Sequence, residues 1–513
     1  MKSISSPVSF SLAQLLDGFV SNVESISSDT DVTGLAWDSR AVKPGDLFFA
    51  CDGENMHGKS FVASAVDAGA SAIALETSDA HEALMLSEKY NGLPVVPVAE
   101  LTGKLGFIAS RFYGNPSAKF SLIGVTGTNG KTSCTHLLAQ CLNSAEHPCG
   151  VIGTMGAGLW GQLQNVQNTT PGAVELQQWL YQLSEQHADY VAMEVSSHGL
   201  EQGRTNACAF DIAVFTNLTQ DHLDYHGDME TYGQVKLKLF NSAGLNAVVL
   251  NLDDSFSDTI LESLSSEISV VGVTLNPEKR RTPGVDVLLG KVVQLSDKGM
   301  TISVESSIGN GEFNTSLLGD FNVTNLLTVF ACAMKLGMAF DEVCQRLSQV
   351  KAPAGRLERF GGGSKPLVVV DYAHSPDALE KVLITLKKHA AGKLLVLMGC
   401  GGDRDQTKRP EMGAVAEAHS DVVWLTNDNP RSESPAAIVN DILKGFKDTE
   451  KVFVELDRET AIRGVVSNAK KNDVVLIAGK GHEDYQIVGD QRLDFSDRKI
   501  VAELLGENVG EAA

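Results

Sequence analysis

The chain has 513 residues, of which 43% are hydrophobic and 21% are charged. This composition is typical of a globular protein with a large core, and the length predicts about three domains. The formal net charge of -22 argues against a general nucleic-acid or membrane-surface binder, because such proteins need a basic face. An anionic ligand in a locally basic pocket remains compatible with this charge.

The eight cysteines are scattered and contain no C-x-x-C pair. This pattern predicts reduced thiols in a cytoplasmic protein rather than a disulfide framework or a zinc site. The N-terminal sequence MKSISSPVSFSLAQLL lacks the long apolar segment of a secretory signal. No stretch reaches the roughly 18 apolar residues of a membrane-spanning helix. We therefore expect no membrane insertion and no nucleic-acid partner.

Residues 1–115 are expected to form a small α/β domain. The apolar runs 47–50 and 72–75 are typical of buried strands, and a helix is expected between them over 60–68. The triplet Asp38-Ser39-Arg40 lies shortly before the first run. On its own this triplet fits a hydrogen-bonded surface turn as well as a binding site.

The segment FSLIGVTGTNGKT, residues 120–132, predicts a phosphate-binding loop between a strand and a helix, with an amphipathic segment at 136–143. Glycines let backbone N–H groups close around phosphate oxygens, and the helix N-terminus adds positive potential. Lys131 would reach the β- and γ-phosphates, and the Thr132 hydroxyl would bind Mg²⁺. Val125 stands where the usual motif has glycine, and a plain glycine turn with a nearby lysine is the alternative.

Residues 116–351 alternate strands and helices, which predicts a parallel, doubly wound sheet. Ligands collect beyond the carboxyl ends of such strands. The strand 190–193 is followed by Glu194, a candidate ligand or water-positioning acid for nucleotide-bound Mg²⁺. A polar exit of this kind is predicted for the strand 248–251 as well.

The strand 212–215 is followed by a stretch rich in Asp and His, which suits a cation or a phosphate. The alternative is that Asp221 and His222 cap the next helix. A helix is expected over 232–240, and its pattern alone places Lys236 and Lys238 on a solvated face.

Residues 255–318 have an uneven, strand-like pattern with turns expected at 276–277 and 310–311. A helix is expected to open at 319–325. The glycine and proline residues of 352–356 and 361–363 indicate a linker.

The last domain, residues 352–513, has four apolar strands that each end in glycine and charge. Arg404 and Arg431 could each bind a carboxylate bidentately, while Asp428 and Glu483 could accept from an ammonium group. Two arginines and two acids suit a zwitterionic amino acid. For any one of these loops the alternative is a plain surface turn. The predicted strands are 367–370, 394–398, 422–425 and 474–477.

Nearly the whole chain resembles the Mur ligase family, and within it the ligases that add meso-diaminopimelate. The motif TGTNGKT at 126–132 is shared across that family, whereas DNPR at 428–431 resembles its narrower diaminopimelate-recognition motif. The other matching stretches are DSR at 38–40, NTTPG at 168–172, MEVSSHGL at 193–200, DHLDYHGDM at 221–229, DYAHSPD at 371–377, GCGGDRD at 399–405 and GKGHED at 479–484.

The resemblance implies an α/β fold of three domains. Residues 1–115 would bind the UDP-MurNAc end of one substrate, residues 116–351 would form the central P-loop domain, and residues 352–513 would form a Rossmann-like domain for the amino acid. The residues implied to bind the UDP-MurNAc-dipeptide are Trp37, Ser39, Glu54, Asn55, Met56, Asn168, Thr169, Thr170, Ser196, Gln202 and Arg204.

For the nucleotide and the magnesium ions, the resemblance implies catalytic roles for Lys131, Glu194, His222 and Lys236, the last as a carbamylated lysine. Val235 departs slightly from the small residue usual before that lysine. Thr132, Glu194, His222 and Lys236 would serve Mg²⁺. The residues implied to bind ATP are Gly127, Thr128, Asn129, Gly130, Lys131, Thr132, Asn322, Arg356, Asp371 and His374. Those implied to bind diaminopimelate are Arg404, Asp428, Asn429, Pro430, Arg431, Gly479 and Glu483.

The implied reaction joins meso-diaminopimelate to the D-Glu γ-carboxylate of UDP-MurNAc-L-Ala-D-Glu through an acyl phosphate. ATP and Mg²⁺ are required, and the product feeds peptidoglycan synthesis and so cell shape and division. A monomer in the cytoplasm is expected. Two alternatives are a ligase of the same family for L-lysine and an enzyme similar to folylpolyglutamate synthase. A nucleotide-binding switch without ligase activity is a third, but it leaves the four loops of the last domain unexplained.

Overall fold

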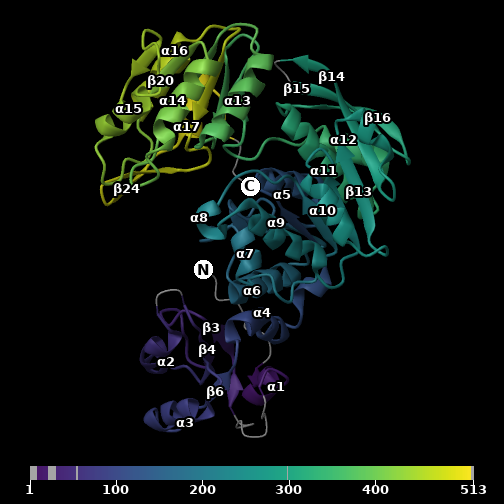
Figure 1. Ribbon diagram of the computed structural model, residues 1–513, viewed down its shortest axis with the longest axis vertical. Coiled ribbons are helices and arrows are strands. Elements are labelled where there is room, and N and C mark those ends of the chain that lie inside the picture. Colours follow the sequence, from purple (N-terminus) through teal and green to yellow (C-terminus); the bar gives the residue numbers. More distant parts are fainter. Residues whose placement is uncertain (1–8, 21–29, 54–55, 297–298, 510–513) are drawn as a thin grey trace. The chain divides into compact units, whose positions relative to one another are not determined.

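A computed structural model describes residues 9–20, 30–53, 56–296 and 299–509 (Figure 1). The chain forms two compact units. The first comprises Met1–Lys131, Leu142–Val248 and Phe256–Ser269, and the second comprises Thr132–Cys141, Val249–Ser255 and Val270–Ala513. None of the described helices is long and apolar enough to cross a membrane. The eight cysteines all lie within the described residues and form no disulfide.

The N-terminal part of the first unit is a four-stranded parallel sheet in the order β3-β4-β5-β6. β4 is buried at every position because helices cover both faces of the sheet. Leu47 and Phe49 point into one cluster, and Phe48 and Ala50 point into the other. The strands are β3 (Gly34–Ala36), β4 (Asp46–Ala50), β5 (Ala72–Glu76) and β6 (Val95–Val98), and the helices are α2 (Val62–Asp67), α3 (Ala80–Lys89) and α4 (Leu101–Phe112).

Both strands predicted in this region are confirmed. The helix predicted over 60–68 is divided into a 3-10 helix, Gly58–Phe61, and α2. A short pair of strands that the sequence did not predict, β1 (Phe10–Ser11) and β2 (Asp31–Val32), lies beside α1 (Leu12–Leu16).

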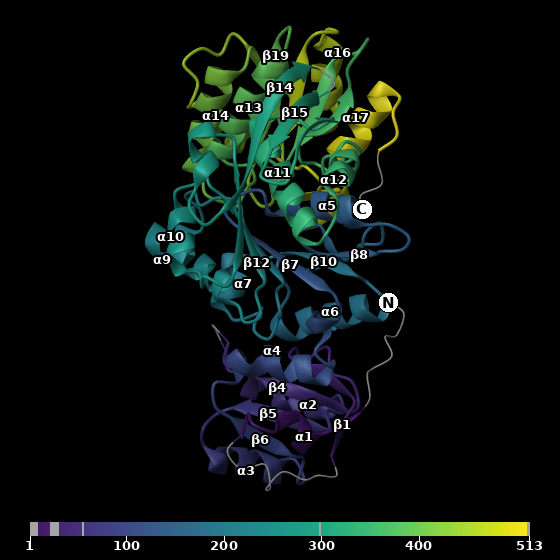
Figure 2. The same cartoon turned by 90° about the vertical axis from the view of Figure 1, so that its right-hand side faces the viewer.

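The first unit also contains strands of the central sheet in the order β11-β7-β10-β8-β9, of which β7, β8 and β10 are labelled in Figure 2. β12 follows β11 in the sheet order; it begins in the first unit and continues in the second. β11, β7, β10 and β8 are parallel, and β9 is antiparallel at the edge. The strands are β7 (Ser121–Thr126), β8 (Cys149–Gly153), β9 (Gly156–Leu159), β10 (Tyr190–Glu194), β11 (Ile212–Phe215) and β12 (Ala247–Asn251). The helices of this unit are α6 (Ala173–Glu185), α7 (Ser197–Glu201), α8 (Leu223–His226), α9 (Met229–Leu237) and α10 (Phe256–Ser263). Helix α5 (Lys131–Leu142) begins at the last residue of the first segment of this unit, and its residues Thr132–Cys141 belong to the second unit.

In the second unit, β14, β15 and β16 form an antiparallel meander. The turn predicted at 310–311 is wrong, because both residues belong to β16 and the chain reverses over Ser306–Gly309. Gly311 serves close packing instead: a Cβ there would lie 2.8 Å from the Phe340 ring. The elements are β13 (Ser269–Thr274), β14 (Asp286–Ser296), β15 (Gly299–Glu305), β16 (Asn310–Thr315), α11 (Asp320–Lys335) and α12 (Phe340–Leu347).

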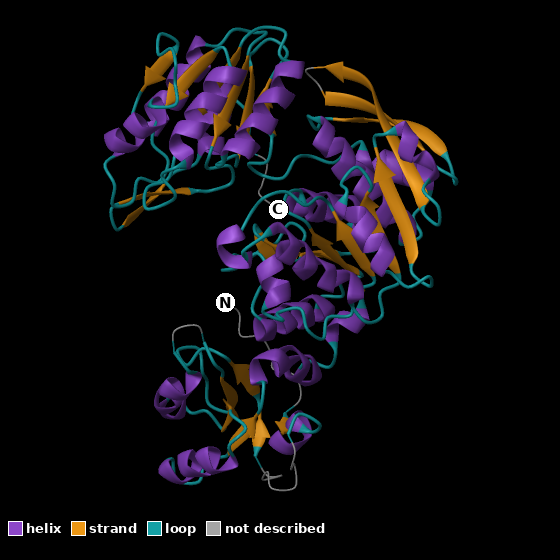
Figure 3. Ribbon diagram, viewed as in Figure 1, coloured by secondary structure: helices purple, strands orange, loops and turns teal. Residues whose placement is uncertain are grey.

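The C-terminal part is a six-stranded sheet in the order β17-β18-β22-β19-β20-β21, between helices (Figure 3). Only β17 is antiparallel in it. All four predicted strands are confirmed, as β18 (Leu367–Asp371), β19 (Leu394–Met398), β20 (Val422–Leu425) and β22 (Val474–Ala478). The unpredicted strands are β17 (Glu358–Gly361), β21 (Val452–Val454), β23 (Tyr485–Val488) and β24 (Gln491–Asp494). The helices are α13 (Pro376–His389), α14 (Lys408–His419), α15 (Pro435–Leu443), α16 (Arg458–Asn468) and α17 (Asp497–Leu505).

The predicted fold class is therefore confirmed. The protein is α/β, with a central parallel sheet that carries the glycine loop, a small N-terminal sheet and a C-terminal Rossmann-like sheet.

A fully buried ion pair joins α16 to α17 in the C-terminal part. Arg458 donates to the two Asp497 carboxylate oxygens over 2.8 and 2.7 Å, and both side chains are 0% exposed. The same guanidinium donates to the carbonyls of Asn427 and Ala478, which follow β20 and end β22. The pair thus fixes the strand ends from which two of the predicted binding loops begin.

Removing one partner of this pair should be costly, since the other charge would stay buried without compensation. We expect Asp497→Ala to lower the free energy of unfolding by about 3 to 5 kcal/mol. Glu459→Ala, which breaks the exposed Arg463–Glu459 pair of the same helix, should cost under about 1 kcal/mol. Urea unfolding of the full chain measures both. A loss for Asp497→Ala no larger than that of the control would contradict the assignment.

Candidate active site

The glycine loop lies between β7 and α5. Gly127 and Gly130 have φ values of 143° and 90°, which favour glycine. Lys131 Nζ donates to the carbonyls of Gly127 and Thr128 over 2.8 and 2.9 Å, so the lysine closes over its own loop. α5 begins at Lys131, five residues earlier than the amphipathic pattern indicated, so Lys131 and Thr132 occupy its first turn.

The segment after β11 holds this loop in place. The Thr128 N–H donates to the Asn217 carbonyl over 2.8 Å, and the Asn129 N–H donates to Asn217 Oδ1 over 3.0 Å. Thr216 Oγ1 donates to the Asn129 carbonyl over 2.6 Å. A Cβ on Gly127 would lie 1.9 Å from Thr216 Oγ1, so this close approach requires glycine. Hydrogen bonds and this close approach therefore join the glycine loop to the segment after β11.

Glu194 is the last residue of β10 and is completely buried rather than at a polar exit. Its carboxylate accepts from the Thr154 N–H over 2.8 Å and from Thr154 Oγ1 over 3.2 Å. A Cβ on Gly153 would lie 2.3 Å from Glu194 Oε1, so glycine leaves the room for this carboxylate. The sequence analysis did not identify Thr154, which lies forty positions earlier and has no motif around it.

His222 lies at the N-cap position of α8 with a φ of 53°, but its side chain makes no capping hydrogen bond. The alternative of a purely capping role is thus not supported for this residue. Its ring lies 4.9 Å from the His198 ring, in an edge-to-face arrangement, and 6.4 Å from the Tyr232 ring. Asp221 Oδ2 lies 3.5 Å from His222 Nε2.

The prediction of a solvated face is wrong for Lys236 and right for Lys238. Lys236 is 1% exposed, and its Nζ lies 4.3 Å from the centroid of the Tyr232 ring. Burial, together with the positive charge of Lys131, holds the pKa of Lys236 well below its ordinary value. Lys238 is exposed and pairs with Glu201 over 2.6 Å. The short pattern around both lysines contains no sign of this difference.

Tyr232 connects the buried lysine to the glycine loop. Its hydroxyl lies 3.3 Å from Thr128 Oγ1, and that Thr128 hydroxyl also accepts from the Thr219 N–H over 3.0 Å. Through this tyrosine, α9 contacts the loop that begins at the end of β7. Among the described residues, no group of three or more His, Cys, Asp or Glu side chains has an arrangement suited to a metal ion.

A cavity of about 1090 Å³ in the first unit collects residues predicted to bind the UDP-MurNAc-dipeptide. Trp37 packs near Gly172, where a Cβ would lie 3.7 Å from the indole. Arg40, Phe49 and Tyr225 also line it. Arg40 and Tyr225 lie in the motifs DSR and DHLDYHGDM but were not among the residues predicted to bind the dipeptide, and Phe49 belongs to a predicted buried strand. The predicted residues among its walls are Trp37, Ser39, Met56, Asn168, Gln202 and Arg204. Glu54 and Asn55 lie outside the described residues.

Hydrogen bonds join the other predicted dipeptide-binding residues to this wall. Arg204 donates to the Thr170 carbonyl over 2.7 Å and to Gln202 Oε1 over 2.9 and 2.6 Å. Thr170 Oγ1 accepts from the Ser196 N–H over 2.9 Å. Thr169 Oγ1 lies 3.0 Å from Thr154 Oγ1, which itself contacts Glu194. Four of the predicted residues, Arg204, Gln202, Thr170 and Ser196, therefore form one hydrogen-bonded group, and Thr169 is linked to the Glu194 carboxylate through Thr154.

In the second unit, three of the four residues predicted near the adenosine and phosphates surround Tyr372. Arg356 lies over the Tyr372 ring at 4.7 Å, and His374 Nδ1 lies 2.8 Å from the Tyr372 carbonyl. Asp371 accepts from the Leu357 and Ala373 N–H groups, and burial raises the pKa of its carboxyl group. The fourth residue, Asn322, is held separately in α11, where it donates to the Leu318 carbonyl over 2.9 Å.

The residues predicted to bind diaminopimelate lie in the loops after β19, β20 and β22. Arg431 has a φ of 50° and donates to the Gly402 carbonyl over 2.6 Å. Arg404, in the neighbouring loop, is exposed, and Pro430 is buried. Gly479 has a φ of 116°, and a Cβ there would lie 2.6 Å from Asp428 Oδ2.

The two predicted acids of this site share a cation that the sequence analysis did not select. Lys480 Nζ lies 3.1 Å from Glu483 Oε2 and 3.7 Å from Asp428 Oδ1, and it donates to Asn429 Oδ1 over 3.0 Å. We name Asp428, Asn429, Lys480 and Glu483 the Lys480 cluster. The motif GKGHED contains Lys480, and its position between Gly479 and Glu483, two predicted site residues, was the feature of the sequence that could have identified it.

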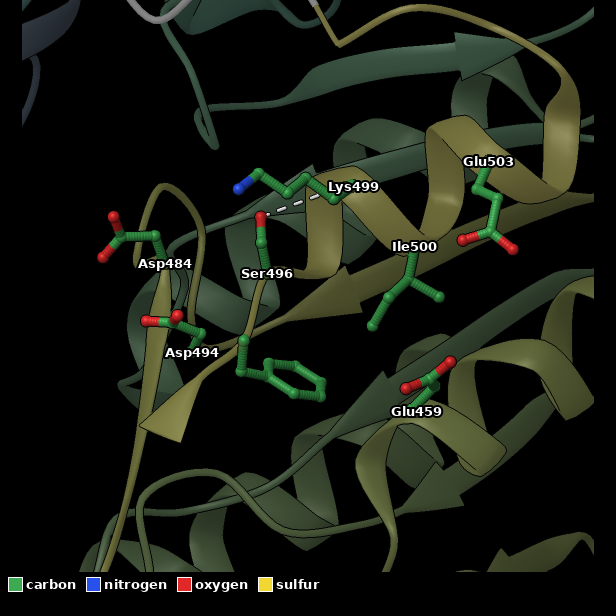
Figure 4. A pocket seen from close by; sticks show the side chains of 8 residues that line it. Glu459, Asp484, Asp494, Ser496, Lys499, Ile500 and Glu503 are labelled. Carbon is green, nitrogen blue, oxygen red and sulfur yellow. Dashed lines mark hydrogen bonds between the residues drawn. The ribbon is translucent and has the colours of Figure 1, made fainter. Parts of the chain in front are cut away.

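A second cavity of about 390 Å³ lies in the C-terminal part (Figure 4). Its charged lining is mainly acidic, with Lys499 as the only cation among the lining residues. None of the predicted site residues lines it. The acids are Glu459, Asp484, Asp494 and Glu503.

Three family profiles match this chain: the Mur ligase family catalytic domain over residues 31–113, the Mur ligase middle domain over 125–333, and the Mur ligase glutamate ligase domain over 355–481. A curated relative from Coxiella burnetii, a UDP-N-acetylmuramoyl-L-alanyl-D-glutamate--2,6-diaminopimelate ligase, is 43% identical over 95% of this chain and 97% of its own length. A relative of the same name from Ectopseudomonas mendocina is 48% identical over 90% of this chain and 93% of its own.

Solved structures agree with these matches. A diaminopimelate ligase of the same name superposes with a TM-score of 0.69 at 33% identity, over 93% of this chain and 95% of that one. A folylpolyglutamate synthase from Thermotoga maritima has a TM-score of 0.59 at 15% identity, over 80% of this chain and 94% of its own, which shows a shared fold alone. On the profiles and the near full-length relatives together, this chain belongs to the Mur ligase family.

Proposed function

We propose that this protein joins meso-diaminopimelate to the D-Glu γ-carboxylate of UDP-MurNAc-L-Ala-D-Glu in an ATP-dependent reaction of peptidoglycan precursor synthesis. The observation that carries the proposal is the near full-length similarity to ligases of that name. Retention of the DNPR loop, with Asp428, Asn429 and Arg431, supports it. A carboxylate is a poor electrophile, and conversion to an acyl phosphate makes it reactive toward the amine.

The three sheets would divide the substrates among them. Residues 1–115 and the cavity around Trp37 and Arg204 would hold UDP-MurNAc-L-Ala-D-Glu. Residues 116–351 would bind ATP, and residues 352–513 would bind the amino acid. We infer a cytoplasmic monomer, which size-exclusion chromatography with light scattering would test.

The residues of the glycine loop fit a nucleotide phosphate. Positive φ values at Gly127 and Gly130 turn the loop so that backbone N–H groups can face an anion, and Lys131 lies over it. ATP supplies the phosphoryl group that activates the carboxylate. Lys131 would leave its loop carbonyls for the phosphate oxygens and neutralise their charge, and positioning and electrostatics dominate such transfers.

The amine of the amino acid would then attack the acyl phosphate through a tetrahedral intermediate. The C–N bond forms, phosphate leaves with the bonding electron pair, and the amine loses its proton. No covalent enzyme nucleophile is needed. In the second unit, Arg356, Asp371 and His374 would contribute to nucleotide binding around Tyr372, together with Asn322.

Magnesium requires oxygen ligands, and Glu194 offers a buried carboxylate with His222 and Thr132 as further candidates. Mg²⁺, when bound, would neutralise phosphate charge. A lysine ammonium fits such a site poorly. We infer that Lys236 reacts with CO₂ and releases a proton to form a carbamate, which turns the cation into an oxygen ligand. Burial beside Lys131 favours the neutral amine that this reaction needs.

The proposed function predicts phosphate release that depends on the amino acid. With Mg²⁺, ATP and UDP-MurNAc-L-Ala-D-Glu, we expect turnover with meso-diaminopimelate and almost none with L-lysine, because L-lysine lacks the distal carboxylate for Arg431. Lys131→Ala should abolish turnover, and Arg431→Ala should mainly raise the KM for the amino acid. A preference for L-lysine would overturn the amino-acid assignment. An unchanged KM in Arg431→Ala would refute the role of that arginine.

Nucleotide binding should depend on glycine at position 127. We expect Gly127→Ala to weaken Mg-ADP binding by at least about tenfold, because its Cβ would displace the Thr216 segment that holds the loop. Gly161→Ala is the matched control: its φ of 85° carries similar strain, but its Cβ would meet nothing within 4 Å. Isothermal titration calorimetry measures both affinities. Equal affinities in the two variants would contradict the phosphate-loop assignment.

The carbamate can be detected without turnover. In protein equilibrated with isotope-labelled bicarbonate, we expect a carbamate carbon resonance in the NMR spectrum that disappears in Lys236→Ala. Lys238→Ala, which removes the exposed lysine two positions later, should retain the resonance. Loss of the signal in both variants, or in neither, would be evidence against a carbamate at Lys236.

A further inference from the structure

Lys480 is a completely buried lysine inside the amino-acid site proposed above. Its Nζ lies within 3.1 Å of both Asn429 Oδ1 and Glu483 Oε2, and 3.7 Å from Asp428 Oδ1. The ring of Tyr485 lies beside it at 5.6 Å. Asp428 and Asn429 come from the loop after β20, Lys480 and Glu483 come from the loop after β22, and Tyr485 begins β23.

The backbone is shaped to bring this ammonium to the acids. Gly479 and Gly481 flank Lys480 with φ values of 116° and 53°. A Cβ on Gly479 would lie 2.6 Å from Asp428 Oδ2, so only glycine lets the two loops approach this closely. The preceding residues of both loops are fixed by Arg458, which donates to the carbonyls of Asn427 and Ala478.

Hydrogen bonds within the Lys480 cluster orient its members. Asn429 Nδ2 donates to Glu483 Oε2 over 3.1 Å, and the same carboxylate oxygen accepts from Lys480. Asn429 Oδ1 accepts from both Lys480 and the Ile487 N–H. Lys480 and the Ile487 N–H therefore both hold Asn429 Oδ1, which leaves the Asn429 Nδ2 group facing Glu483. A buried charge is stable only when it is paired and hydrogen-bonded in this manner.

The charges of the cluster indicate which ligand group it can accept. Asp428 and Glu483 bring two negative charges, and Lys480 neutralises one of them. We propose that Lys480 is a positioning residue of the amino-acid site: it aligns Asn429 and Glu483 and leaves the cluster with one net negative charge, which suits a single ammonium group of the incoming amino acid. This inference rests on the proposed function.

Replacing Lys480 should raise the KM for the amino acid and leave the KM values for the other two substrates nearly unchanged. We expect Lys480→Met to raise the KM for meso-diaminopimelate by at least about tenfold, the usual effect of losing one charge-assisted hydrogen bond. The KM values for ATP and UDP-MurNAc-L-Ala-D-Glu should stay within about twofold. Lys480→Arg should fall between Lys480→Met and the wild type, since it keeps the charge but alters the geometry. Lys387→Met is the control, because that exposed lysine pairs with Asp421 on the surface.

A double variant separates charge balance from a merely structural role. Lys480→Met with Glu483→Gln restores one net negative charge, so its KM for meso-diaminopimelate should be lower than the product of the two single effects predicts. If Lys480→Met alone does not fold, the double variant is compared with Glu483→Gln, whose cluster carries no net charge. A lower KM for meso-diaminopimelate in the double variant, which has one net negative charge, then supports charge balance, and an equal or higher KM contradicts it.

Three results would overturn the inference. These are an unchanged KM for meso-diaminopimelate in Lys480→Met, a similar rise in the KM of all three substrates, and multiplicative effects in the double variant. Each of them leaves the proposed function intact when the wild-type protein turns over meso-diaminopimelate. Absence of wild-type turnover with that amino acid would overturn the proposed function and this inference together.

Discussion

Parallel strand register is the constraint on which the candidate site depends. In the central sheet, Glu194 lies opposite Val125, and Thr126 lies opposite Phe215. Parallel neighbours end at the same edge, so the segments that follow β7, β10 and β11 must all begin there. The glycine loop, the Glu194 carboxylate and the Thr216–Thr219 segment are therefore brought together before any side chain makes a contact. The C-terminal sheet repeats this arrangement, with Asp371 opposite Ala478 and Met398 opposite Leu425.

Three ionisable side chains around these sites are buried: Glu194 at the end of β10, Lys480 after β22 and Lys236 in α9. Each has a different set of neighbours. Glu194 receives hydrogen bonds from Thr154. Lys480 is compensated by two carboxylates. Lys236 faces the Tyr232 ring, and within the described part of the chain it makes no ion pair with a carboxylate. Burial, together with the positive charge of Lys131, disfavours the charged form of Lys236 and lowers its pKa.

The sequence predicted the strands well because a buried parallel strand has a simple signature, a short β-branched run with glycine and polar residues at its end. The four C-terminal strands and β7, β10 and β11 all carry it. Prediction from the sequence failed where a residue's role depends on contacts with distant parts of the chain. Asn310-Gly311 has the composition of a turn, but Gly311 is needed where the Phe340 ring packs against β16. Thr154 contacts Glu194 only because β8 lies beside β10.

Burial of the lysines shows why a site is harder to predict than a fold. Lys236 lies near the end of α9 and Lys238 begins the 3-10 helix Lys238–Asn241 directly after it, yet Lys236 is buried and Lys238 pairs with Glu201 at the surface. No property of that short sequence separates them, because burial depends on which face of α9 meets the glycine loop through Tyr232. Lys480 likewise looks like a loop residue between two glycines, and only the loop after β20 supplies the acids that make it part of a site. The environment of each lysine is thus set by its neighbours: two carboxylates lie beside the Lys480 amine, whereas burial and the nearby positive charge of Lys131 hold the pKa of Lys236 well below its ordinary value.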